Sequence, residues 1–289
     1  MTGANGAVGR AIVRAAPSRH VEVIAAVRSE RAAEDVRALG SAASVVRVSY
    51  DGHATLVRAM ENAAVVIHLP GVLFERPGST YEGANVETTR RMTQAATEAG
   101  VRKIVLVSAV GADERSSNRY WRSKAYAEAV VGTSGVLFTV LRVPMLLGRA
   151  TEAAATLRRR LRHGTIPLLD GGRTVHQPLD VDDLAHGALR ASADGVASGH
   201  TLDLVGPAAV TMREIVERAA ATTSPRVRVV PVPVRAVRLV ARVLRGRGSS
   251  PDVLEVLTTG TRIDPTPAVR ALGIELTPLD HTIRESLRP

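Results

Sequence analysis

The opening of the sequence constrains the fold more than any other feature. Three glycines, Gly3, Gly6 and Gly9, are spaced three residues apart in the run Thr2-Gly3-Ala4-Asn5-Gly6-Ala7-Val8-Gly9. Glycine is needed where a backbone turns with a positive φ or approaches a phosphate closely. When such a turn opens a helix, the amides of the first helical turn can bind a pyrophosphate. Glycine-rich turns also serve as plain strand-to-helix connections, so the segments that follow decide between the two.

Apolar segments with the character of buried strands alternate with amphipathic segments through the first half of the chain. The predicted strands are Val21–Val27, Val45–Val48, Ala64–Leu69, Lys103–Val107 and Val136–Val143. The first predicted helix follows the glycine-rich turn and ends near Ala15, and the others are Glu30–Leu39, Ala54–Asn62, Glu82–Ala99 and Tyr120–Val131. Strands and helices that alternate at this spacing form right-handed crossovers and a doubly wound parallel sheet. We therefore predict an α/β Rossmann fold, with residues 1–150 as the dinucleotide-binding domain.

The alternation of predicted strands and helices is less regular in the second half of the chain. A helix rich in arginine is predicted at Ala153–His163, and a glycine-rich turn follows at 170–172. A helix from Val181, a strand at His200–Val205 and a helix from Thr211 come next. We expect residues 151–289 to form a smaller substrate lobe interleaved with the last strands of the sheet.

The composition narrows both the core and the chemistry. Hydrophobic residues make up 45% of the 289 residues but aromatic residues only 2%, so the core must be built from aliphatic side chains. The absence of cysteine excludes disulfides, thiolate metal sites and cysteine nucleophiles. His163 and His176 have no partners at metal-ligand spacing, so no metal site is expected. Redox chemistry would therefore need a bound organic cofactor.

The net charge of +10 would ordinarily suggest a polyanionic partner. Here the excess is arginine spread along the chain, with Lys103 and Lys124 as the only lysines. No zinc-finger spacing, aromatic-studded basic strand or basic tail accompanies it, so we expect a small-molecule substrate and no nucleic-acid partner. No apolar run of about 18 residues and no signal-peptide pattern is present, which favours a cytoplasmic protein. The sequence does not indicate an oligomeric state.

A basic amphipathic helix is predicted at Val234–Arg247. Valines and leucines occupy one face, and the other face carries Arg235, Arg238, Arg242 and Arg245. Such a helix either lies on an anionic membrane surface or covers the substrate lobe with its arginines in water. We favour the second arrangement.

The strand that should precede the glycine loop is missing, because Met1 stands where that central strand would be ending. Without it the first strand is truncated, and its two neighbours would have unpaired backbone groups. We hypothesise a misplaced start, in which a GTG valine codon has been read as the initiator. The natural chain would then continue upstream through roughly five to eight apolar residues. Mass spectrometry of the natural N-terminus would test this.

Two residues at strand ends bear on the choice of dinucleotide. If the missing strand is counted as the first, Val21–Val27 is the second strand of the sheet. An acidic residue at its end would hold the ribose 2′-hydroxyl of NAD, but Arg28 occupies that position. A guanidinium suits the 2′-phosphate, so NADP is favoured, with NAD as the alternative. Asp51 ends the third strand, where it either accepts a hydrogen bond from the adenine amine or shapes the turn before Gly52.

Tyr120 and Lys124 form a candidate catalytic pair. Their i, i+4 spacing places both on one face of the predicted helix. A nearby cation stabilises the phenolate, so the tyrosine can exchange a proton with a carbonyl or alcohol while hydride moves to or from a nicotinamide. The alternative is an ordinary exposed Tyr/Lys helix face. Because the chain has only two lysines and four tyrosines, chance gives this pairing low odds.

Several motifs together resemble the short-chain dehydrogenase/reductase superfamily. More narrowly, the chain is similar to its extended and atypical epimerase/dehydratase-like branch, including complex I accessory-subunit-like and NmrA-like reductases. The motifs are Thr2–Gly9, Asn85–Thr89, Val107–Ala112, Tyr120–Lys124, Leu141–Pro144 with Gly148, His176–Ala185, and Leu202–Pro207 with Thr211 and Glu214. The likeness covers nearly the whole chain, and it specifies no substrate.

The resemblance implies a set of site residues. It places the dinucleotide at the loop residues Gly3, Asn5, Gly6, Ala7, Val8 and Gly9, and at Arg28, Asp51, Leu69, Pro70, Gly71 and Lys124. It makes Tyr120 the acid/base, Lys124 its activator and Ser108 the hydroxyl that holds the substrate oxygen. The family usually has its catalytic serine or threonine one or two places later, where this chain has Ala109 and Val110.

Two function classes follow from these residues. The first is an NAD(P)-dependent oxidoreductase, or an epimerase with the same hydride chemistry, acting on a small carbonyl or alcohol. The second is a non-catalytic NAD(P)H-binding sensor or accessory subunit of a larger complex. Asp182 and Asp183 either face the substrate or cap the following helix, and we favour a cap.

Overall fold

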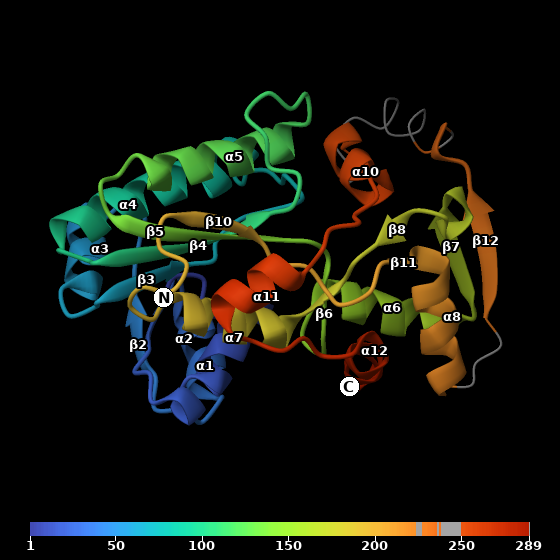
Figure 1. Cartoon of the computed structure of the whole chain (residues 1–289), viewed down its shortest axis with the longest axis horizontal. Coiled ribbons are helices and arrows are strands. Elements are labelled where there is room, and N and C mark those ends of the chain that lie inside the picture. The colour runs from blue at the N-terminus through green and yellow to red at the C-terminus, as the bar shows by residue number, and fades with distance from the viewer. Residues whose placement is uncertain (224–226, 236, 238–249, 289) are drawn as a thin grey trace. The chain divides into compact units, whose positions relative to one another are not determined.

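The computed structural model of the chain describes residues 1–223, 227–235, 237 and 250–288 (Figure 1). These residues form two compact units. The first unit comprises Met1–Val143, Asp182–Leu204 and Thr266–Glu275, and the second comprises Pro144–Val181, Val205–Pro265 and Leu276–Pro289. The chain therefore leaves the first unit at residue 143 and returns to it twice.

Parallel strands form the centre of the first unit. They are β1 (Ile24–Val27), β2 (Ser44–Arg47), β3 (Val65–His68), β4 (Lys103–Ala109), β5 (Leu137–Val143) and β10 (His200–Asp203). One ladder pairs β1 with β2, and the other runs in the order β10-β5-β4-β3, with every pairing parallel. This arrangement confirms the predicted doubly wound sheet.

The residues at the start of the chain join the two ladders. Thr2 forms parallel bridges to both Ala26 and His68. The Thr2 amide donates to the Ile67 carbonyl at 3.0 Å, and the Ala26 amide donates to the Met1 carbonyl at 2.8 Å. Met1 and Thr2 therefore occupy the central strand position directly before the glycine loop.

Helices cover both faces of this sheet. Figure 1 shows α3, α4 and α5 along one face and α1, α2 and α7 along the other. The helices of the first unit are α1 (Ala7–Ala15), α2 (Glu30–Arg37), α3 (His53–Met60), α4 (Thr88–Glu98), α5 (Arg119–Gly132), α7 (Val181–Ala191) and α11 (Thr266–Leu272), with short turns η1 (Pro17–Arg19) and η2 (Glu82–Glu87). The first residue of α7, Val181, belongs to the second unit. The segment predicted to be helical over Glu82–Ala99 is helical as far as Glu98, and its first part, η2, is a π-helix.

The core of the first unit is aliphatic, as the composition requires. Side chains on the α3, α4 and α5 face pack into one cluster that includes Leu56, Met92, Ile104 and Leu106. A second cluster under α1 and α2 includes Val13, Ala25 and Val36. Small alanines let the helices approach the sheet closely, which fixes the strand ends that carry the site.

The second unit is built from short strands and helices. Its elements are β6 (Leu146–Leu147), α6 (Glu152–His163), β7 (Thr165–Leu169), η3 (Asp170–Gly172), β8 (Val175–His176), β9 (Leu179–Asp180), β11 (Val210–Thr211), α8 (Met212–Thr223), β12 (Arg228–Val232), α10 (Pro251–Thr258) and α12 (Leu279–Leu287). β12 pairs with β7 and β6 with β9 in parallel, whereas β11 and β8 are antiparallel. Leu157, Ile166, Ile215 and Ile283 belong to its core.

One predicted segment falls on residues that the structure does not describe. The basic helix predicted at Val234–Arg247 lies almost wholly outside the described residues, including Arg238, Arg242 and Arg245. No helix within the described ranges is both long and apolar enough to cross a membrane. The same ranges contain no group of three or more His, Asp and Glu side chains placed to hold a metal ion.

Candidate active site

The glycine loop has the backbone that its sequence requires. Gly3 has a φ of +76°, which is a left-handed conformation. A Cβ at Gly9 would lie 2.5 Å from the Ala4 carbonyl oxygen, so only glycine fits there. Gly6 is the N-cap of α1 and has no side-chain cap. The first amides of α1 therefore remain available to a ligand, and Asn5 and Gly6 are exposed while Ala7 and Val8 are half-buried.

The segment after β3 lies against this loop. A Cβ at Gly3 would lie 3.2 Å from the Leu69 Cβ and 3.4 Å from Pro70. A Cβ at Gly71 would lie 3.4 Å from the Lys124 Nζ and 3.2 Å from the Asn85 Oδ1. The structure thus brings together the glycine loop, the Leu69-Pro70-Gly71 strand end and Lys124. The missing side chains at Gly3 and Gly71 leave a cradle, which fits the approach of a dinucleotide backbone.

Arg28 directly follows β1, and Asp51 lies in the turn that follows β2. Arg28 directly follows Val27 and is exposed, and its neighbour Ser29 caps α2 by accepting from the Ala32 amide at 3.3 Å. The Asp51 carboxylate is ion-paired with Arg91 from α4, and its side chain is 90% exposed. Arg91 also donates to the Tyr50 carbonyl at 3.1 Å. The Asp51 turn is therefore tied to α4 and remains open to solvent.

Lys124 is buried on α5. Asn118 caps this helix, because its Oδ1 accepts from the Tyr120 amide at 3.0 Å and the Trp121 amide at 3.3 Å. The Lys124 side chain is 5% exposed, and its Nζ donates to the Val107 carbonyl at 2.9 Å. Burial lowers the pKa of Lys124 to about 8, and the Glu128 carboxylate opposes that shift. The amine therefore titrates near the working pH of most enzymes.

Tyr120 is half-buried one turn earlier on the same helix. Its ring lies 5.8 Å from the Tyr81 ring, centroid to centroid. Burial raises the pKa of Tyr120, and the neighbouring Tyr81 adds to the effect. The phenol is therefore protonated at neutral pH. Tyr120 and Lys124 are one turn apart on α5, and their joint catalytic role stays a prediction.

A second set of residues around Tyr120 was missed at the sequence level. Tyr81 donates its hydroxyl to the Leu73 carbonyl at 2.9 Å, and Arg119 stacks over its ring at 5.4 Å. Arg119 also pairs with Glu75 at 2.8 Å. These contacts hold the segment that follows β3 against the start of α5, beside Tyr120. Their sequence separations of up to 44 residues leave no local signal, although Tyr81 is one of only four tyrosines.

Asn85 links the same segment to α5. Its Oδ1 accepts from the Val72 amide at 2.9 Å, and its Nδ2 donates to the Ser123 hydroxyl at 2.8 Å. Asn85 is 1% exposed and lies in the π-helical η2, a local structure that often marks functional sites. Only the family resemblance singled it out.

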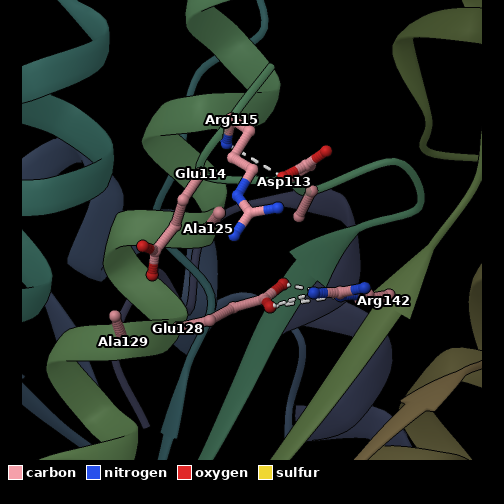
Figure 2. A pocket seen from close by; sticks show the side chains of 8 residues that line it. Asp113, Glu114, Arg115, Ala125, Glu128, Ala129 and Arg142 are labelled. Atoms are coloured by element: carbon pink, nitrogen blue, oxygen red, sulfur yellow. Dashed lines mark hydrogen bonds and ion pairs between the residues drawn. The ribbon is translucent and has the colours of Figure 1, made fainter.

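The Ser108 hydroxyl is bonded to a side chain of α5. Its hydroxyl donates to the Glu128 carboxylate on α5, and the side chain is 3% exposed. Beside this contact is a cleft of about 430 Å³, lined by Ala112, Asp113, Glu114, Arg115, Ala125, Glu128, Ala129 and Arg142 (Figure 2). The role of Ser108 as a substrate-holding hydroxyl stays a prediction.

Comparison with known proteins gives one family and several relatives. A family model described as NAD(P)H-binding matches residues 3–176. Subunit 9 of the NADH dehydrogenase [ubiquinone] 1 alpha subcomplex is 29% identical in Arabidopsis thaliana, covering 74% of this chain and 55% of that protein. The mouse form is 27% identical over 99% of this chain and 78% of that protein. A Stigmatella aurantiaca ketoreductase for a farnesyl dihydroquinoline oxide is 29% identical, covering 83% of this chain and 78% of that protein.

Solved structures share the fold at low identity. MoeE5 in complex with UDP-glucose and NAD has a TM-score of 0.77 and 18% identity, covering 99% of this chain and 96% of that one. An NADPH-dependent quinone oxidoreductase of Escherichia coli has a TM-score of 0.71 and 19% identity, covering 98% and 97%. At these identities the likeness establishes the fold alone.

Proposed function

Because the chain belongs to the NAD(P)H-binding family, we propose that it is an NAD(P)-dependent oxidoreductase acting on a small carbonyl or alcohol. The family membership agrees with the short-chain dehydrogenase/reductase resemblance of its motifs. One observation carries the catalytic part of the proposal. Tyr120 and Lys124 share one face of α5, and the Lys124 Nζ lies beside Gly71 at the dinucleotide cradle. An epimerase that returns the hydride to its own substrate uses the same residues.

Each part of the cradle has a role toward the dinucleotide. The amides of the loop from Gly3 to Gly9 would hold the pyrophosphate, and Gly71 would admit the nicotinamide half. Lys124 would donate to the nicotinamide ribose. Arg28 is exposed directly after β1, where its guanidinium would bind a 2′-phosphate. We therefore propose a preference for NADP over NAD. When bound, the nicotinamide supplies or accepts the hydride.

Tyr120 moves the proton. In reduction, hydride adds to the carbonyl carbon and the Tyr120 hydroxyl gives its proton to the carbonyl oxygen, which leaves a phenolate. The Lys124 ammonium stabilises that phenolate, and water returns the proton afterwards. Because burial raises the pKa of Tyr120, the phenol is protonated at neutral pH, as reduction of a carbonyl requires.

The substrate class is a further part of the proposal. The Stigmatella relative is named as a ketoreductase for a dihydroquinoline oxide with an oxo group on its ring. In this chain the half-buried Tyr120 ring packs against the buried Tyr81 ring, and Phe74 on the segment after β3 is 37% exposed. Aromatic side chains favour planar ring systems. We therefore propose cyclic conjugated ketones and quinones as the first substrates to test.

A second candidate is an NAD(P)H-binding accessory subunit without catalysis. The relatives named as NADH dehydrogenase subunits suggest it. One structural observation favours it as well, because the Ser108 hydroxyl is bonded to Glu128 and the next two residues, Ala109 and Val110, have no hydroxyl.

Binding and turnover separate the two candidates. Trp121 is the only tryptophan and precedes Lys124 by three residues, so quenching of its fluorescence reports NADPH and NADH binding. Turnover is followed by loss of NADPH absorbance across a panel of cyclic ketones and quinones. We expect Tyr120→Phe to lower kcat by about 100-fold or more while NADPH affinity is unchanged. Tyr126→Phe is the matched control, since Tyr126 lies on the same helix and is 42% exposed. NADPH binding with no turnover, or equal turnover in Tyr120→Phe, would support the accessory subunit instead.

A further inference from the structure

Glu128 continues the face of α5 that carries the catalytic pair. Tyr120, Lys124 and Glu128 follow one another at intervals of four residues, so they form one stripe along the helix. The Glu128 carboxylate accepts from the Ser108 hydroxyl on β4. It also accepts from Arg142 on β5, with Nε at 3.0 and 3.1 Å from the two oxygens and Nη2 at 2.6 Å (Figure 2). Glu128 thus ties α5 to two adjacent strands.

Lys124 and Glu128 are bonded to two consecutive residues of β4. Lys124 donates to the Val107 carbonyl, and Glu128 is bonded to the next residue, Ser108. Ser108 and Arg142 are directly paired in the β4–β5 register. The carboxylate therefore fixes both the rotation and the height of α5 over β4, and these two settings decide where the Lys124 Nζ lies.

The ion pair is not explained by stability alone. The Glu128 side chain is 11% exposed and the Arg142 side chain 29% exposed. Burying two charges costs desolvation that roughly cancels their attraction, and an apolar pair of similar volume would serve the core as well. A bidentate pair does give fixed geometry, because the planar guanidinium matches the carboxylate in one orientation.

We infer that Glu128, held by Arg142 and Ser108, is a positioning residue that sets the place and the charge of the Lys124 ammonium. Its importance for catalysis rests on the proposed function, but the positioning itself does not. Glu128 contacts neither the loop from Gly3 to Gly9 nor the Gly71 cradle, and it acts through Lys124.

The groups that face Lys124 make the sign of the effect definite. His68 on β3 has a pKa lowered to about 3 by burial, so it is neutral, and the Tyr120 phenol is neutral as well. Glu128 is the anion that opposes the lowering of the Lys124 pKa, and Arg142 offsets part of the Glu128 charge. Removal of the Glu128 charge should therefore lower the Lys124 pKa, and removal of the Arg142 charge should raise it.

Lysine NMR tests this without cofactor or substrate. Protein grown with [ε-13C]lysine gives two lysine signals, from Lys103 and Lys124, and a Lys103→Arg variant assigns them. We expect a Lys124 pKa near 8 in the unaltered protein. Glu128→Gln should lower it by about one pH unit, and Arg142→Met should raise it. Glu114→Gln is the matched control, because it removes a carboxylate from the same cleft without changing any contact of α5 described above.

Two more variants cover the risk of misfolding. The double variant Glu128→Gln/Arg142→Met leaves no unpaired buried charge, and because it removes both charges its Lys124 pKa should lie between those of Glu128→Gln and Arg142→Met. Glu128→Asp keeps the charge and should return the pKa toward the original value. Equal Lys124 pKa values in all these variants would overturn the inference, and so would shifts opposite in sign.

The inference and the proposed function fail in different ways. The NMR titration stands if no substrate is ever turned over. If a substrate is found, the high-pH limb of its rate profile should move down in Glu128→Gln by the same amount as the Lys124 pKa, because activity needs the ammonium. A moved pKa with an unmoved limb would keep the positioning and remove Lys124 from the rate-limiting step.

Discussion

Alanine substitutions at Gly6 and Gly9 should separate folding from cofactor binding within one loop. A Cβ at Gly9 would lie 2.5 Å from the Ala4 carbonyl oxygen and 2.6 Å from both the Ala4 carbonyl carbon and Cα. These are backbone atoms, so no rotamer change relieves the overlap. Gly6 differs, because its φ is −70° and its nearest neighbour is the Gly3 carbonyl oxygen at 3.4 Å. Alanine therefore fits the empty loop at Gly6 and not at Gly9.

The expected magnitudes follow from those distances. Overpacking of this kind costs about 1 to 3 kcal/mol, and the helix propensity of alanine returns about 0.5 to 1 kcal/mol of it. At the upper end of that cost, which contact with backbone atoms requires, the net loss is about 2 to 2.5 kcal/mol, so Gly9→Ala should lower the Tm by about 4 to 10 °C for a protein of this size. Gly6→Ala should keep the Tm within about 1 °C, yet its methyl group occupies the place of a phosphate oxygen, so NADPH affinity should fall by about 100-fold or more.

Differential scanning fluorimetry of the cofactor-free protein measures the first effect, and Trp121 quenching by NADPH measures the second. A Gly9→Ala protein as stable as the original would refute the steric reasoning. A Gly6→Ala protein that binds NADPH normally would remove the pyrophosphate from this loop.

Three further predictions test the rest of the site. Gly71→Ala puts a methyl group 3.4 Å from the Lys124 Nζ and 3.2 Å from the Asn85 Oδ1, so NADPH affinity measured by Trp121 quenching should fall about tenfold with little change in Tm. Ser108→Ala should reduce kcat by less than about tenfold, because the hydroxyl is bonded to Glu128; a loss of about 100-fold or more would support the substrate-holding role instead. Lys124→Met should abolish turnover but raise the free energy of unfolding at pH 7 by about 1 to 3 kcal/mol. The pKa of Lys124 is about 8 in the folded chain and 10.5 in its ordinary state, so the unfolded chain binds the proton more tightly and the folded chain is penalised below pH 8. That advantage should vanish as pH rises through 10.5 in urea unfolding, and a Lys124→Met protein less stable than the original at pH 7 would contradict it.

The sheet and its phosphate loop were predictable because they depend on local patterns. Apolar runs and intervening amphipathic segments specify the strands and crossovers, and crossover handedness then fixes their order. The glycine spacing indicates a phosphate loop because such a loop needs a positive φ or a close approach to phosphate, and Gly3 has a positive φ. The close packing of Gly9 against Ala4 is a further requirement that only the structure shows. The i, i+4 spacing of Tyr120 and Lys124 likewise needs only a helix to become a shared face.

Other parts of the site depend on contacts that no local pattern specifies. Residues 82–99 have the composition of one amphipathic helix, and the π-helical start at η2 arises where Asn85 bonds both Val72 and Ser123. Glu75, Tyr81 and Arg119 meet only after β3 and α5 are placed. The contact of Ser108 was within reach, however. Extending the Tyr120 and Lys124 stripe by four more residues leads to Glu128, and strand alternation puts Ser108 and Ala109 on opposite faces of β4.

The burial of the pair has a consequence for the direction of chemistry. Desolvation acts on both groups toward their neutral forms, raising the pKa of Tyr120 and lowering that of Lys124. Oxidation of an alcohol would need the phenolate as a base, which burial disfavours, whereas reduction of a carbonyl starts from the phenol that burial favours. Reduction in turn creates the phenolate, so it depends on an ammonium that persists to about pH 8. The Glu128 carboxylate opposes the loss of that charge, and Arg142 holds it against the two strands that carry Val107 and Ser108. The same burial that prepares Tyr120 for reduction therefore makes an anion behind Lys124 necessary.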